Sequence, residues 1–178
     1  TPRLSSAASD VYKRQDDDPV IFFEHKTLYG LQGEVPEGDY LVPFGKARIV
    51  SEGSDCTLVA TGRMVSFCED AANALSADGI SCDIIDPRTT SPLDEDAILD
   101  SVEKTGRLIV VDETPPRCSF AADVAALAAS EVFSSLKAPI KTVTGPHSPV
   151  PFAKELETAF LPSPVKIKTV IEQTVNFS

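Results

Sequence analysis

The fold is decided by residues 56–85, CTLVATGRMVSFCEDAANALSADGISCDII. Cys56–Ala60 form a continuous apolar run, which is typical of a strand that is buried on both faces. After a short turn, apolar side chains recur at helical spacing over residues 63–77, and Gly79 suits the left-handed position that follows a helix. A second apolar strand is expected over residues 80–85. This order of strand, helix and strand predicts a parallel β–α–β unit.

The same alternation continues toward the C-terminus. Further apolar strands are expected at 107–111 and 139–143. Helices are expected from Ser91-Pro92 and Asp94 to a stop at Gly106, from Phe120 to about Leu136, over 152–160 and over 163–174. Apolar strands that alternate with helices predict the α/β fold class, as a three-layer sandwich around a mostly parallel sheet.

The N-terminal part has a different character. Residues 1–15 lack apolar periodicity, and SSAASDVYKRQ resembles translated adapter sequence, so we expect residues 1–17 to be a non-native or disordered tail. Residues 19–24, PVIFFE, are expected to form a short apolar strand. Residues 25–47 contain several glycines and prolines and are expected to form an extended linker.

Composition excludes several classes of protein. The chain has 178 residues, of which 42% are hydrophobic, and this is enough apolar material for a core. The net charge of -11, without a run of Lys and Arg, argues against nucleic-acid and anionic-membrane partners. No apolar run reaches the length of a membrane span, and no signal peptide is visible. We therefore expect a cytoplasmic protein.

The four cysteines are Cys56, Cys68, Cys82 and Cys118. They have no CxxC spacing and no histidine nearby, so free thiols in a reducing compartment explain them better than zinc or disulfides. A pair of Cys118 with His147 is conceivable, but no third group is available to orient it.

The strand ends carry the polar residues that could form a site. Ligands of open α/β sheets bind beyond the carboxyl ends of the strands. Here those ends are residues 61–63, 86–90, 112–117 and 144–147. One interpretation is an anion-binding cleft; the interpretation that we favour is a row of solvated tips in which Arg88 pairs with Asp112 or Glu113.

Specific catalytic motifs are absent from the sequence. There is no GxGxxG, no phosphate-binding GxxxxGK[ST] and no GxSxG. His25 and His147 are too isolated to make a metal site, which needs three or four ligands. We therefore assign no catalytic, cofactor-binding or metal-binding residue to this chain.

The proline-rich loop PHSPVPF (146–152) has two interpretations. Its prolines fix an extended path from which Val150 and Phe152 project. The loop either packs rigidly on its own domain or presents a preformed interface, and the sequence favours neither.

Several uninterrupted motifs follow one another in the order found in a known family. They are PVIFFEHKTLYG, GEVPEGDYLVPFGKARIVSEGSD, TLVATGRMV, CDIIDPRTTSPLDEDAILDSVEKTGRLIVVDE and TGPHSPVPFAKELETAFLPS. The chain resembles the beta subunits of the thiamine-diphosphate-dependent decarboxylating component of 2-oxoacid and acetoin dehydrogenase complexes. The variants DPRTTSPLD (86–94) and DETPPRC (112–118) look most like the acetoin and related bacterial pyruvate dehydrogenase subgroup.

The resemblance implies a domain organisation. Residues 18–45 would be the last strand of a pyrimidine-binding domain plus a linker, and residues 46–178 a transketolase C-terminal-like domain. In the full enzyme, thiamine diphosphate and magnesium would lie between alpha and beta subunits, and the activating glutamate would lie in the other domain. The chain by itself is therefore expected to be inactive and to bind no cofactor.

The resemblance also implies partners and a bacterial cytoplasmic location. These partners are an alpha subunit and a second beta subunit in a heterotetramer, and a lipoyl acyltransferase core. The residues expected at such interfaces are His147, Pro149, Val150, Phe152 and Phe177. The alternatives are a stand-alone α/β anion- or nucleotide-binding domain and a scaffold domain without a ligand; the missing phosphate-loop glycines disfavour the binding domain.

Overall fold

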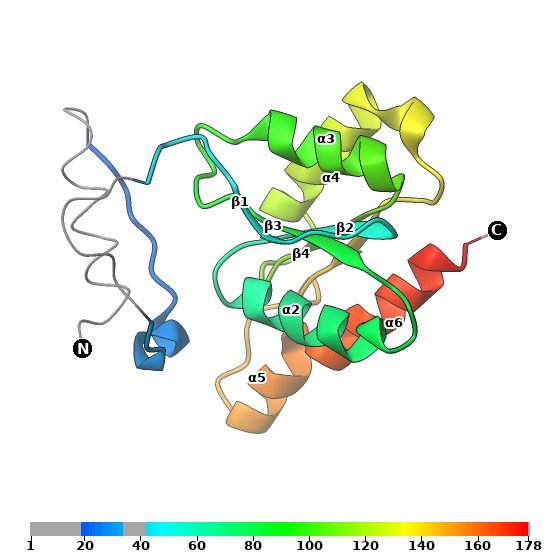
Figure 1. Cartoon of the computed structure of the whole chain (residues 1–178). Coiled ribbons are helices and arrows are strands. Elements are labelled where there is room, and N and C mark those ends of the chain that lie inside the picture. Colours follow the sequence, from blue (N-terminus) through cyan, green and yellow to red (C-terminus); the bar gives the residue numbers. More distant parts are fainter. Residues whose placement is uncertain (1–18, 34–41, 178) are drawn as a thin grey trace.

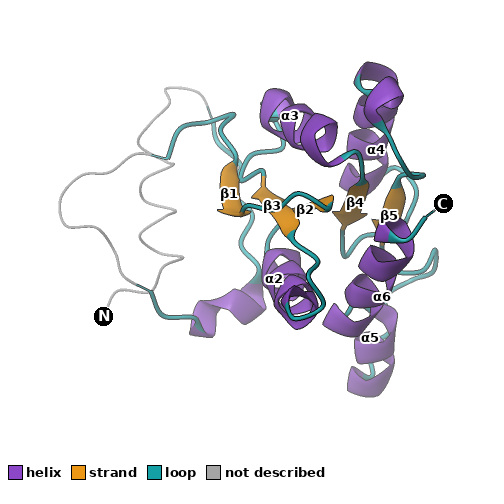
Figure 2. Ribbon diagram, turned by 45° about the vertical axis from the view of Figure 1, so that its right-hand side comes forward, coloured by secondary structure: helices purple, strands orange, loops and turns teal. Residues whose placement is uncertain are grey.

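A five-stranded sheet forms the centre of the computed structural model, which describes residues 19–33 and 42–177 (Figures 1 and 2). Its strand order is β1-β3-β2-β4-β5. The strands are β1 (Arg48–Ser51), β2 (Cys56–Ala60), β3 (Cys82–Asp86), β4 (Leu108–Val111) and β5 (Lys141–Val143). β2, β3, β4 and β5 run parallel, and β1 pairs antiparallel with β3. The predicted mostly parallel sheet is confirmed.

Helices cover both faces of the sheet, as the three-layer prediction requires (Figure 2). One face is covered by α2 (Arg63–Ser76) and α6 (Pro164–Val175), with the short α5 (Lys154–Phe160) leading into α6; the other is covered by α3 (Glu95–Thr105) and α4 (Phe120–Glu131). Successive strand residues supply the two layers. Leu58 packs in the core under α2 and α6, whereas its neighbour Val59 packs in the core under α3 and α4. This double burial explains the continuous apolar strands.

The predicted helix limits are mostly confirmed. Gly79 has a φ of 78° and Gly106 a φ of 74°, and Gly106 caps α3 by donating from its N–H to the carbonyl of Val102. The helix predicted to reach Leu136 is wrong at its end. It stops at Glu131 because Val132 leaves the helical region (φ -126°, ψ 26°), and the 3-10 helix η2 (Phe133–Ser135) follows.

The expectations for the N-terminal part need correction. Residues 19–24 form no strand with the described part of the chain, and their expected place in the sheet of a pyrimidine-binding domain stays a prediction. An apolar run becomes a strand only beside a partner strand. The expected linker, residues 25–47, contains the 3-10 helix η1 (Lys26–Gly30), and β1 begins at Arg48, directly after the linker. The expected tail, residues 1–17, lies outside the described residues.

The prediction of buried free thiols is confirmed for three of the four cysteines. Cys56, Cys68 and Cys82 are buried free thiols, and Cys118 is an exposed one. In the described ranges no helix combines the length and the apolar character that crossing a bilayer would need.

Candidate functional site

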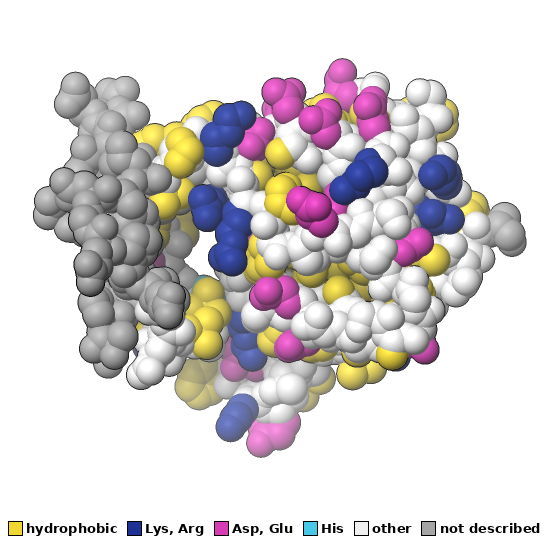
Figure 3. Space-filling model, in the orientation of Figure 1, with side chains coloured by type: hydrophobic (Ala, Val, Ile, Leu, Met, Phe, Trp, Pro, Cys, Tyr) yellow, Lys and Arg dark blue, Asp and Glu magenta, His cyan; other side chains and the backbone are white. Residues whose placement is uncertain are grey.

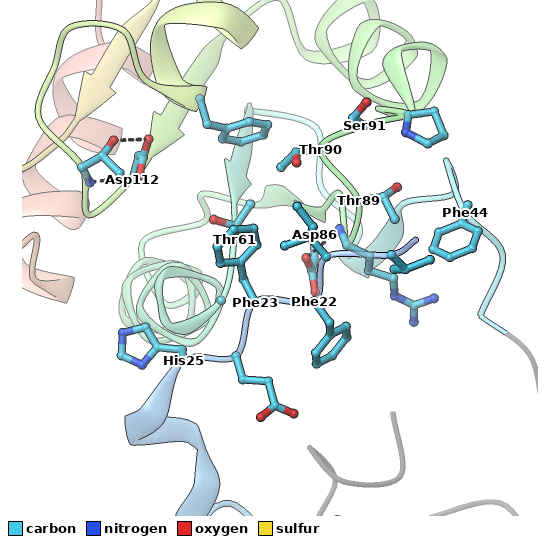
Figure 4. Close-up of a pocket in the computed structure, with 18 of the residues that line it drawn as sticks. Phe22, Phe23, His25, Phe44, Thr61, Asp86, Thr89, Thr90, Ser91 and Asp112 are labelled. Carbon is cyan, nitrogen blue, oxygen red and sulfur yellow. Dashed lines mark hydrogen bonds between the residues drawn. The ribbon is translucent and has the colours of Figure 1, made fainter. Parts of the chain in front are cut away.

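The four predicted strand ends lie at one edge of the sheet, because β2, β3, β4 and β5 run parallel. The residues after β2, β3 and β4 line a cavity of about 980 Å³. Figure 4 shows Thr61, Asp86, Thr89 and Asp112 around this cavity. The fourth end, with His147, does not line the cavity. The sequence predicted the shared edge correctly, because the carboxyl ends of parallel strands lie together, but of the four predicted loops only three line the cavity.

Residues 19–25 form the opposite wall of the cavity (Figure 4). His25 Nε2 lies 2.9 Å from Glu113 Oε1 and joins this segment to the end of β4. Nδ1 of His25 accepts from the backbone N–H of Thr27 at 3.3 Å, which starts η1. Sequence reasoning missed this pair, since nothing local relates a histidine before η1 to a carboxylate after β4.

The carboxylates of this edge are occupied within the chain. Asp112 accepts from the backbone N–H and hydroxyl of Thr114, at 3.0 and 2.6 Å, and from the N–H of Ala121 at 3.3 Å. Glu113 is paired with His25. Burial raises the pKa of Asp86, and the N–H of Arg88, 3.1 Å away, offsets this only in part. These carboxylates hold loops in place.

Arg88 does not behave as the favoured interpretation expects. In the described ranges it makes no ion pair with Asp112 or Glu113, and that expectation is wrong. Its backbone has a φ of 61°, and the N–H of Arg88 donates to Asp86 within a tight turn. The turn fixes Arg88 at the cavity wall beside Asp86.

Charge is unevenly spread over the surface in Figure 3. Acidic side chains gather over α3, and basic side chains stand on the side that faces residues 19–25. Arg88 contributes one positive charge to the wall of the cavity, whereas Asp86, Asp112 and Glu113 contribute carboxyl groups. The cavity is therefore of mixed polarity and is not a dedicated anion site.

The edge offers little chemistry by itself. No three His, Cys, Asp or Glu side chains of the described residues gather as a metal site would require. Cys118 lies on an exposed turn with a φ of 50°, and in the part of the chain that the structure describes no hydrogen bond joins it to His147. A magnesium-bound diphosphate needs oxygen ligands for its metal, and the carboxylates of Asp112 and Glu113 are already engaged with Thr114, Ala121 and His25.

The proline-rich loop leaves its apolar side chains in solvent. Val150 is 62% exposed and Phe152 fully exposed, while His147 and Pro149 are exposed as well. Leu156, on the first turns of α5, is 60% exposed. The loop therefore does not pack these side chains on its own domain.

Phe177 lies apart from that loop. It is 49% exposed and follows α6, at the opposite end of that helix from α5 (Figures 1 and 2). Arg107 holds this end in place by donating to the carbonyls of Thr174 and Val175, at 3.2 and 3.3 Å. The five predicted interface residues thus belong to two separate surfaces.

The chain is similar in sequence to several known proteins. Residues 45–167 match the family model described as "Transketolase, C-terminal domain". The acetoin:2,6-dichlorophenolindophenol oxidoreductase subunit beta of Bacillus subtilis is 55% identical over 156 residues, which are 88% of this chain and 46% of that protein. The subunit of the same name from Cupriavidus necator is 52% identical over 90% of this chain and 48% of that protein.

A second group of relatives is more distant. The pyruvate dehydrogenase E1 component subunit beta of Rickettsia felis is 42% identical over 92% of this chain and 50% of that protein. This chain thus spans about half the length of the curated relatives it matches. Among solved structures, the inactive beta4 tetramer of a split-gene transketolase superposes with a TM-score of 0.67 at 22% identity, over 80% of this chain and 45% of that one. That likeness shows the shared fold.

Proposed function

This chain belongs to the transketolase C-terminal domain family, and from that premise we propose that it serves as the corresponding domain of a beta subunit in a thiamine-diphosphate-dependent acetoin or pyruvate dehydrogenase. The observation that carries the proposal is the 55% identity to an acetoin oxidoreductase beta subunit over 88% of the chain. Within it, residues 46–178 form the transketolase-like domain. Residues 18–45 join it to a pyrimidine-binding domain, and the whole complex acts in the bacterial cytoplasm.

The role of this domain is assembly. Val150, Phe152 and Leu156 are exposed apolar side chains within seven residues of sequence, and solvated groups of this kind mark protein interfaces. A rigid loop with three prolines loses little conformational entropy on binding. The partners are an alpha subunit, a second beta subunit and the lipoyl acyltransferase core. Of the expected interface residues, His147, Pro149, Val150 and Phe152 belong to this loop, and Phe177 serves a separate contact.

The cofactor site lies outside this chain. When bound, thiamine diphosphate with magnesium supplies the carbanion chemistry that splits the substrate next to its carbonyl group. Asp112 and Glu113 are already engaged with Thr114, Ala121 and His25, which supports this placement. The residues of this chain therefore position loops and partners.

Calorimetry tests the placement of the cofactor. Thiamine diphosphate with magnesium is titrated into the 178-residue chain, and no binding heat is expected up to millimolar cofactor. Dissociation constants in the micromolar range would contradict the proposal. Titration with ADP or inorganic phosphate in the same experiment tests the alternative of a stand-alone nucleotide or anion binder, which the carboxylates of the cavity disfavour.

A domain exchange tests the function itself. The 156 matching residues of the Bacillus subtilis subunit are replaced by those of this chain, and the hybrid is combined with the partner subunit of that enzyme. We expect assembly and acetoin-dependent reduction of 2,6-dichlorophenolindophenol. A hybrid that folds but neither assembles nor reduces the dye would refute the proposed role.

A further inference from the structure

Two buried thiols face each other at the edge of the sheet opposite the cavity. Cys56 begins β2 and Cys82 begins β3, and the two residues are partners in the parallel register. Their Sγ atoms are 3.5 Å apart, and their exposed fractions are 0% and 4%. Neither thiol touches the strand ends described above. Nothing in the proposed function requires two adjacent thiols at this position.

Cys82, unlike Cys56, borders a surface cavity. Cys82 lines a surface cavity of about 300 Å³ between the start of β3 and the end of α2. Cys56 does not line this cavity. Cys82 is thus the cysteine of the pair that lies nearer the surface, with an exposed fraction of 4% against 0% for Cys56.

The turn between β1 and β2 fixes the surroundings of Cys82. Gly53 passes so close that a Cβ atom there would lie 2.4 Å from the backbone of Cys82. The N–H of Gly53 donates to Asp83 at 2.7 Å, and the hydroxyl of Ser51 donates to the carbonyl of Cys82 at 2.8 Å. The start of β3 is thus clamped, and the two thiols are held side by side.

The hydrogen bond between the thiols makes them chemically unequal. Sγ of Cys56 donates to Sγ of Cys82, which lowers the pKa of the Cys82 thiol although burial and the carboxylates of Asp55 and Asp83 oppose this. The same hydrogen bond and burial raise the pKa of Cys56. Thiolates are the reactive form of cysteine, and both the hydrogen bond from Cys56 and the cavity beside Cys82 favour Cys82 as the nucleophile.

We propose that Cys82 is a peroxide-reactive thiol and that Cys56 is the resolving thiol with which it forms a reversible disulfide. Hydrogen peroxide is the oxidant. The Cys82 thiolate attacks one peroxide oxygen, the O–O bond breaks, and Cys82 becomes a sulfenic acid while water leaves after protonation. The sulfur of Cys56 then attacks the sulfur of Cys82, the S–O bond breaks, and a second water leaves. Two thiols have together lost two electrons to one peroxide.

The geometry permits this second step without rebuilding the sheet. Neighbouring strands lie about 5 Å apart, so the Cα atoms of Cys56 and Cys82, which are register partners, lie within the range that disulfides span. The sulfurs must move from 3.5 Å to a bond length of about 2 Å, which side-chain rotation can supply. A thiol reductant reverses the reaction by exchange.

The other two cysteines provide internal controls. Cys68 is fully buried on α2, and burial raises the pKa of its thiol. Cys118 is exposed on the turn after β4. Oxidation of Cys118 therefore shows that the peroxide dose is sufficient to oxidise an exposed thiol. Oxidation of Cys68 would show that the core has opened non-specifically.

Peptide mapping of the full chain tests the proposal. The reduced protein is treated with graded hydrogen peroxide, remaining thiols are blocked with N-ethylmaleimide, and tryptic peptides are analysed by mass spectrometry. We expect the peptide 49–63, which holds Cys56, to become linked to the peptide 64–88, which holds Cys68 and Cys82. The link should also form in Cys68→Ala and should be reversed by dithiothreitol.

A second variant tests the order of the two thiols. In Cys56→Ser, Cys82 has no resolving partner, so a sulfenic acid should persist there and be trapped by dimedone. The proposal is overturned if Cys82 stays reduced at peroxide doses that oxidise Cys118, or if the linked peptide is absent from folded Cys68→Ala. Whether Cys82 is oxidised before Cys118 is decided by the wild-type protein alone, so the test remains even if a variant fails to fold. The outcome is independent of the proposed function.

Discussion

At the scale of single residues, a buried carboxylate joins three elements. Asp83 on β3 is 3% exposed and accepts from the hydroxyl of Ser101 at 2.6 Å and from Lys104 at 2.5 Å, both on α3. It also accepts from the N–H of Gly53. Burial alone would raise the pKa of Asp83, but Lys104, Ser101 and Gly53 together lower it. Ser101 in turn contacts Thr57 on β2 at 2.8 Å, so the network links the sheet to α3.

We predict that Asp83 makes stability depend on pH in the acid range. A carboxyl group whose pKa is lower in the folded state stabilises the fold above its unfolded pKa of about 4. That contribution is lost as the pH falls from there through the folded pKa. In urea denaturation, Asp83→Asn should lower stability at pH 7 and flatten the pH dependence below about pH 4. Asp100→Asn, at an exposed position on α3, is the control and should leave the stability at pH 7 and its change with pH as in the wild-type chain.

At the scale of elements, turn chemistry and neighbouring strands set the boundaries. Gly106 ends α3 where the sequence predicted because a left-handed residue is needed there. β1 was not predicted: only four residues form it, and they are exposed or half-buried instead of alternating clearly. Its existence depends on the free edge of β3, which lies far away in sequence.

We predict that Gly106→Ala destabilises the chain by about 1–2 kcal/mol, the cost of a left-handed conformation for a residue with a Cβ. The new methyl group would also lie 2.7 Å from the side chain of Lys137, which can move only in part. The midpoint of urea unfolding measures the loss. Gly30→Ala is the matched control, because nothing lies within 4 Å of its added Cβ. A loss as large at Gly30 as at Gly106 would contradict the explanation.

At the scale of the whole molecule, one end of the domain carries uncovered apolar surface. The loop before α5 and the first turns of that helix expose Val150, Phe152 and Leu156, although both central cores are closed. Burying a side chain such as Phe152 at an interface contributes roughly 1.5–3 kcal/mol. The domain thus has well-buried cores but leaves apolar side chains exposed that a partner could cover.

We predict that Phe152→Asp prevents assembly of the hybrid beta subunit without destabilising this chain. Phe152 is fully exposed, so its loss should change unfolding free energy by less than about 0.5 kcal/mol. Sedimentation should show unassembled hybrid subunits. Phe160→Ala provides the contrast: that ring is 6% exposed, and its removal should cost about 3–5 kcal/mol. Normal assembly of Phe152→Asp would remove the loop from the interface.

The sequence by itself determined the fold class, the four parallel strands and the loops that meet at one edge. These follow from apolar runs, helical spacing and turn residues, which act over a few neighbours along the chain. Tertiary structure alone decided the rest, because each feature depends on a distant partner. The apolar run at residues 19–24 pairs with no strand of the described chain, whereas β1 pairs with the edge of β3. The contacts of His25 with Glu113 and of Cys56 with Cys82 join segments that are distant in sequence, so they exist only in the folded chain.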